Sequence, residues 1–137
     1  MNVQSIINHC LGLGYRDLEN YAGENYVKVY NYICKETTGE NANTLLIGSI
    51  LTCVASDGKL SDLETKFMQS FIGGYTYDSA LNAASNFYND EAQNIVKNLY
   101  NKFPSDVKEA YVKMCIAVLA VDKKIADYER YFLNKIL

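Results

Sequence analysis

The chain has 137 residues, of which 49 % are hydrophobic and 21 % charged, as in a globular domain and unlike a disordered chain. Its net charge is −3 and its isoelectric point about 5.1, which argues against a general binder of nucleic acid or anionic membranes, because such a binder needs a basic surface. The first residues show no signal-peptide pattern and the longest mostly apolar stretch, residues 45–55, is too short to span a bilayer, so we expect one cytoplasmic domain over residues 1–137, without membrane insertion.

The first forty residues predict two helices separated by a glycine break. An apolar helix is expected over Val3–Leu11, and Gly12-Leu13-Gly14 interrupts it. A tyrosine-rich helix follows over residues 24–37 and is closed by Gly39. No linker or charge block marks this part as a separate domain.

The middle of the chain predicts three more helices. Residues 43–56 carry apolar side chains on one face, as do residues 61–72, and Gly73-Gly74 follows the second of these as a helix stop. Residues 78–88 form a weaker, alanine- and asparagine-rich helix.

The last third of the chain has the clearest helical periodicity. A helix over residues 90–102 is stopped by Pro104, and Ser105 is the expected N-cap of the next helix. That helix carries an apolar stripe made of Val107, Ala110, Tyr111, Met114, Val118 and Val121. A final helix covers residues 125–136. The sum is an all-α bundle of seven or eight helices in one domain.

The chain contains an internal repeat at a spacing of 65 residues. Residues 55–67 align with residues 120–132, and each segment follows an apolar helix and opens an amphipathic one. The pairs that coincide are Ala55 with Ala120, Asp57 with Asp122, Lys59 with Lys124, Asp62 with Asp127, Glu64 with Glu129, and Phe67 with Phe132. We therefore expect a pair of similar helix–acidic turn–helix units.

These two segments resemble the TerB-like family, named after a tellurite-resistance protein. The pattern Asp-Gly-x-Leu-x-x-x-Glu of residues 57–64 is echoed near the C-terminus, and the resemblance covers residues 43–137. It implies an all-helical fold and a bacterial tellurite-resistance or stress-response setting. The family's acidic positions fall on Asp57, Glu64, Asp122 and Glu129, where the resemblance implies a divalent cation, Ca²⁺ or Mg²⁺.

The first acidic turn also has a purely structural interpretation. Ser61 and Glu64 have the spacing of a capping box, in which each side chain accepts a hydrogen bond from the other residue's backbone N–H. An EF-hand is disfavoured, because its first and third positions would be Cys53 and Ala55, which offer no side-chain oxygen.

Other chemistries find little support in the residues. A ferritin-like di-iron site needs two histidines and the chain has only His9, which we interpret as ordinary packing. No nucleophile elbow, phosphate loop or zinc-protease motif occurs. The acidic turn would repel DNA phosphates. The widely spaced cysteines Cys10, Cys34, Cys53 and Cys115 are expected to be thiols, and Tyr26, Tyr30, Tyr77, Tyr88, Tyr100 and Tyr111 to be core-edge residues.

The function predicted from these features is that of a non-enzymatic interaction module in a bacterial stress-response or phage-defence system. It would bind a protein partner through an acidic face made of Asp57, Asp62, Glu64, Asp122, Asp127 and Glu129. The alternative is a divalent-metal sensor or buffer, and an enzyme that uses Asp57 with Glu64 comes third. No cofactor other than such a cation is expected.

Overall fold

The computed structural model describes residues 2–35, 46–47, 61–72 and 98–121. Of these residues, 86 % are helical and none forms a strand, which confirms the predicted all-α class. Four helices are described at both ends, and residues 46–47 and 98–102 are also helical. The expected total of seven or eight helices includes segments outside the described residues.

Helix α1 spans Val3–Leu11, the bounds predicted from the sequence. Its N-cap is Asn2, whose side-chain oxygen accepts a hydrogen bond from the backbone N–H of Ser5 at 3.0 Å. The chain then turns through Gly12 to Gly14, and Gly14 is the N-cap of the next helix. The predicted break is therefore confirmed.

Helix α2 spans Tyr15–Cys34, so the prediction that it begins at residue 24 and extends to residue 37 is wrong. The helix includes Gly23, although an internal glycine costs about 1 kcal/mol relative to alanine. An apolar stripe outweighs that cost, because burying each large aliphatic side chain contributes about 1.5–3 kcal/mol. The stripe has helical spacing and consists of Leu18, Ala22, Tyr26, Val29 and Ile33, all buried.

Helix α4 spans Asp62–Phe71, in agreement with the prediction over residues 61–72. It ends at Ile72, which is extended and whose N–H still donates to the Met68 carbonyl at 3.0 Å. Gly73-Gly74, the expected stop, lies outside the described residues. Phe67 and Met68 are fully buried and hold this short helix against the rest of the molecule.

Helix α7 spans Ser105–Ala120, and its N-cap is Pro104 rather than the predicted Ser105. Pro104 is extended, and its carbonyl accepts from the Lys108 N–H at 2.9 Å. The N–H that proline lacks costs nothing here, because the N–H groups at the start of a helix have no acceptor within the helix. The N-cap side chain makes no capping hydrogen bond. Ser105 is the first helical residue instead.

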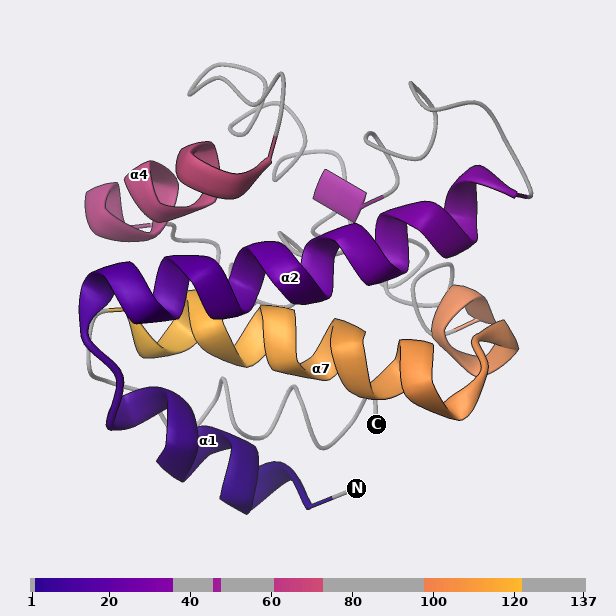
Figure 1. Ribbon diagram of the computed structural model, residues 1–137, viewed down its shortest axis with the longest axis horizontal. Helices are drawn as coiled ribbons and strands as arrows, with labels where there is room; N and C mark the ends of the chain where they lie inside the picture. The colour runs from indigo at the N-terminus through magenta and orange to yellow at the C-terminus, as the bar shows by residue number, and fades with distance from the viewer. Residues whose placement is uncertain (1, 36–45, 48–60, 73–97, 122–137) are drawn as a thin grey trace.

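Helix α7 is the centre of the described core. The predicted stripe is buried, but so are residues on its other faces, including Val112, Cys115, Ile116 and Leu119. Figure 1 shows α2 lying antiparallel along α7; α1 packs against α7, and α4 contacts both α2 and α7. None of the described helices is long and apolar enough to cross a membrane.

Several predicted elements lie wholly or mainly outside the described residues. Residues 46–47 of the predicted 43–56 helix are helical, and Leu46 is fully buried. The helices expected over residues 78–88 and 125–136 are not covered, and only residues 61–67 and 120–121 of the two repeat copies are described. The repeat therefore stays a prediction.

Candidate functional site: the groove between α2 and α4

The predicted acidic face is described only at Asp62 and Glu64. Asp62 is exposed in the first turn of α4, whereas Glu64 is 6 % exposed. Glu64 Oε1 accepts from the Ser61 N–H at 3.1 Å, and Ser61 Oγ accepts from the Glu64 N–H at 3.0 Å. The capping box is thus confirmed, and the Glu64 carboxylate stabilises the start of α4.

The predicted metal ligands are not brought together by the part of the chain that the structure describes. Asp57, Asp122 and Glu129 lie outside it, as does Asp127 of the predicted face. Within it, no group of three or more His, Cys, Asp or Glu side chains is placed to hold a metal ion. The cation site stays a prediction.

A groove of about 440 Å³ lies between α2 and α4. We call it the α2/α4 groove. It is lined by Glu19, Asn20, Gly23, Glu24, Val27, Ser70 and Phe71. Three of the seven, Glu19, Asn20 and Gly23, belong to the half of α2 that was not predicted to be helical, so the groove was not anticipated.

The spacing of residues along α2 builds one wall of the α2/α4 groove. Glu19, Gly23 and Val27 follow one another at intervals of four, which places them on one face of the helix. Gly23 leaves a notch in that face because it has no side chain, and Phe71 packs beside it, since a Cβ atom there would lie 3.8 Å from the Cβ of Phe71. This spacing beside the buried stripe is the sequence signal that marks the wall.

Aromatic contacts fix the other wall. The Phe71 ring packs edge-on against Tyr26 of α2 at a centroid distance of 5.8 Å and against Phe67 at 5.5 Å. The Phe67 ring in turn meets Tyr15 at 5.7 Å. These contacts join residues distant in sequence and hold α4 beside α2, which explains why no local pattern predicts the groove.

The lining of the α2/α4 groove is both acidic and apolar. It includes the half-buried Glu19 and the exposed Glu24, and none of its described lining residues is a lysine or an arginine. Val27 is 52 % exposed, the highest value among the large hydrophobic residues that the structure describes as exposed. Tyr15 and Leu63, on the same two helices, are also exposed. Apolar exposure beside charge is typical of a contact surface.

A second depression of about 320 Å³ lies where α1, α2 and α7 meet. It is lined by Ser5, Ile6, His9, Tyr21, Glu109 and Lys113. His9 packs against the Tyr21 ring at 5.3 Å, in line with the predicted packing role, and Lys113 pairs with Glu109 at 3.3 Å. Burial, then contact with the Cys10 thiol and the charge of Glu109, raises the pKa of Tyr21 above the ordinary value for a phenol.

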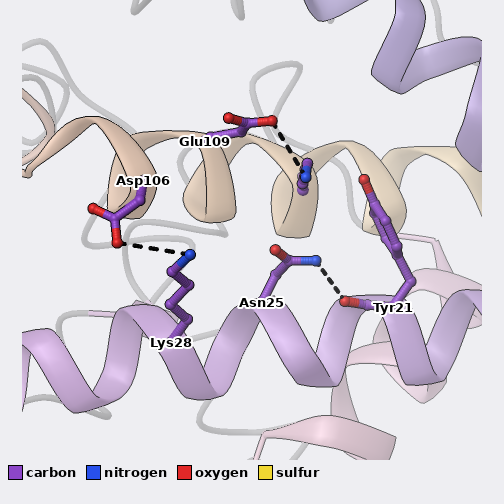
Figure 2. A network of polar contacts seen from close by, with 6 residues as sticks. Tyr21, Asn25, Lys28, Asp106 and Glu109 are labelled. Atoms are coloured by element: carbon purple, nitrogen blue, oxygen red, sulfur yellow. Dashed lines mark hydrogen bonds and ion pairs between the residues drawn. The ribbon is translucent and has the colours of Figure 1, made fainter. Parts of the chain in front are cut away.

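Polar contacts continue from this depression along the edge between α2 and α7 (Figure 2). Asn25 Nδ2 donates to the Tyr21 carbonyl at 2.8 Å, and the ammonium of Lys28 lies 3.7 Å from the Asp106 carboxylate. Both members of that ion pair are well exposed, so it contributes little to stability. We interpret this edge as structural.

The described cysteines carry thiols rather than disulfides, as predicted. Cys10 and Cys115 are buried and Cys34 is half-buried, whereas Cys53 lies outside the described residues. Of the six tyrosines predicted at the core edge, Tyr26, Tyr100 and Tyr111 are buried and Tyr30 is half-buried. The remaining two, Tyr77 and Tyr88, lie outside the described part.

Comparison of the chain with protein-family models, with curated proteins and with solved structures gives no match.

Proposed function

We propose that this chain is a non-enzymatic helical module that binds a protein partner through an acidic surface. The observation that carries the proposal is the α2/α4 groove, where Glu19 and Glu24 stand beside the exposed Val27 and the half-buried Phe71. An apolar contact there would exclude water, and the carboxylates at its edge would select the partner by charge.

The repeat and the family resemblance support a proposal for the type of domain and for the cellular system in which it acts. In this proposal the module is a TerB-like cytoplasmic domain of seven or eight helices in a bacterial stress-response or defence system. Asp57, Asp122, Asp127 and Glu129 would extend the acidic surface, together with the exposed Asp62 at the start of α4. Glu64 would contribute through the helix cap.

Site-specific photo-crosslinking in the native host tests this function. Benzoylphenylalanine placed at Val27 would form a crosslinked protein adduct, whereas the same group at the exposed Asn101 would not. Adducts at neither position, or equal adducts at both, would contradict the use of this surface.

A calorimetric titration tests the alternative, a divalent-metal sensor or buffer. The two matched acidic turns of the sequence favour this alternative, with Asp57, Glu64, Asp122 and Glu129 as ligands. Heat of binding with Ca²⁺, Mg²⁺ or Zn²⁺, together with a higher melting temperature, would support a metal-binding function. Neither effect is expected for a module that acts through protein contact alone.

A further inference from the structure

The α2/α4 groove, of about 440 Å³, has an apolar part where Gly23 of α2 faces Phe71 of α4. Gly23 leaves a notch between Glu19 and Val27, which lie about 12 Å apart along the axis of α2 because the helix rises about 1.5 Å per residue. Val27 and Phe71 offer apolar surface at this notch. An inserted leucine or isoleucine side chain would cover both.

The carboxylates of the groove lie on either side of that notch. Glu19 precedes Gly23 by four residues and Glu24 follows it directly, so they flank it around the helix. Within the described residues, no ion pair engages Glu19 or Glu24, although Lys28 is one turn from Glu24. Lys28 pairs instead with Asp106 across to α7. The groove thus presents two negative charges beside an apolar notch.

This combination selects among classes of occupant. Nucleic acid is disfavoured because its phosphates would meet carboxylates. An acidic peptide is disfavoured because its carboxylates would be repelled by those of the groove. A neutral apolar segment would bury Val27 and Phe71 but leave both carboxylates desolvated without cations, which costs free energy. A segment that carries both cations and an aliphatic side chain matches the two carboxylates and the apolar side chains of the lining.

We propose that the occupant of the α2/α4 groove is a basic amphipathic helix of the partner protein. One of its aliphatic side chains enters the notch at Gly23, and lysine or arginine side chains one turn away pair with Glu19 and Glu24. This inference rests on the proposed function and adds to it the chemical class of the partner.

Fluorescence anisotropy with a designed peptide tests the inference. The probe is a labelled helix-forming peptide of alanine, leucine and lysine, with its leucines along one face. One control peptide has glutamate in place of every lysine, and a second has serine in place of every leucine. The full chain should bind the probe, with an affinity that falls as salt is added, and should bind neither control.

Variants of the chain locate the binding to the groove. The double substitution Glu19→Gln with Glu24→Gln should lower the affinity for the probe about fivefold or more. Gly23→Leu, which fills the notch with a better helix former, should lower that affinity about tenfold or more. Val27→Ser removes one apolar wall at an exposed position and should also weaken binding. Asp17→Asn is the matched control, because it removes a negative charge from an exposed position of α2 outside the groove. It should change the affinity less than about twofold.

Several outcomes would overturn the inference. Equal loss with Asp17→Asn and with the double substitution would show that only net charge matters. Equal binding of the glutamate peptide, or of the Gly23→Leu chain, would exclude this occupant. Self-association of the chain in sedimentation, lost in Gly23→Leu, would assign the groove to a second copy instead.

The crosslinking experiment separates this inference from the proposed function. A partner captured at Val27, and still captured after both glutamates are replaced, would leave the function standing and remove the basic helix. Binding of the probe without any captured partner would show that the groove accepts a basic helix but would contradict the proposed function.

Discussion

Helix α2 packs against α7 and against α4, which also contact each other, and the two interfaces of α2 differ in how fully they are closed. Toward α7, side chains from Val107 to Val121 are buried on almost every face of that helix, and polar contacts follow the edge (Figure 2). Toward α4, a few aromatic rings make the contact and the α2/α4 groove stays open beside them. A closed interface supports the fold, and an open one leaves surface for a partner.

The largest effect on the free energy of unfolding is expected from a cavity in the buried core around α7. Ile116→Ala should lower the free energy of unfolding by about 2–5 kcal/mol, because Ile116 is fully buried in α7 and its truncation leaves a cavity. On the open side, Val27→Ala should change that free energy by about 0.5 kcal/mol or less, since Val27 is already half in water. Urea unfolding of both variants measures the difference, and similar losses would contradict the contrast between the two interfaces.

Alkaline pH should lower the free energy of unfolding through Tyr26, whose ring contacts Phe71 of α4. Burial, reinforced by the neighbouring Tyr30 and Cys34, raises the pKa of Tyr26 from 10.0 to about 12. The buried phenol is favoured in its neutral form, so its contribution to stability is fully present below pH 10 and is lost as the pH rises through 12.

The substitution Tyr26→Phe isolates this contribution. It keeps the ring that meets Phe71 and removes the ionisable group, so the fall in unfolding free energy between pH 10 and pH 12 should become shallower. Burial also raises the pKa of Tyr21 and Tyr100, so the fall should not vanish. An unchanged slope in the Tyr26→Phe chain would show that this tyrosine is already ionisable in the folded state.

A smaller effect is expected at the start of α4. Ser61→Ala removes the acceptor for the Glu64 N–H and should cost about 1 kcal/mol of unfolding free energy. Glu64→Gln should cost less, because an amide oxygen can still accept from the Ser61 N–H. Hydrogen exchange of the α4 amides, compared with those of α7, locates the change. Faster exchange in α7 than in α4 would contradict a local cap.

The elements predicted correctly from the sequence are those marked by residues within the element itself, such as caps, glycines and apolar spacing. The bounds of α1 follow from its apolar spacing and the glycines after it, and the start of α4 follows from Ser61 and Glu64, whose side chains act within one turn. The stripe from Val107 to Val121 likewise marks α7. These predictions needed no knowledge of the neighbouring helices.

The remaining features depend on contacts between distant residues. The first half of α2 is rich in charged and polar residues and contains Gly23, so its helical form is set by the stripe it buries against the core. The α2/α4 groove exists because Phe67 and Phe71 meet Tyr15 and Tyr26. No spacing within either helix encodes that meeting.

The smallest expected effect concerns the floor of the α2/α4 groove. Gly23→Ala should raise the free energy of unfolding by about 0.5–1 kcal/mol, because alanine restricts the unfolded chain and favours the helix. The added methyl would lie 3.8 Å from the Phe71 Cβ, an ordinary van der Waals contact, so α4 need not move. Urea unfolding beside wild type measures the gain. A loss of stability would mean that α4 lies closer to α2, and that the notch is closed. A gain would show that the glycine costs stability at this position of α2 and that the added methyl fits beside Phe71.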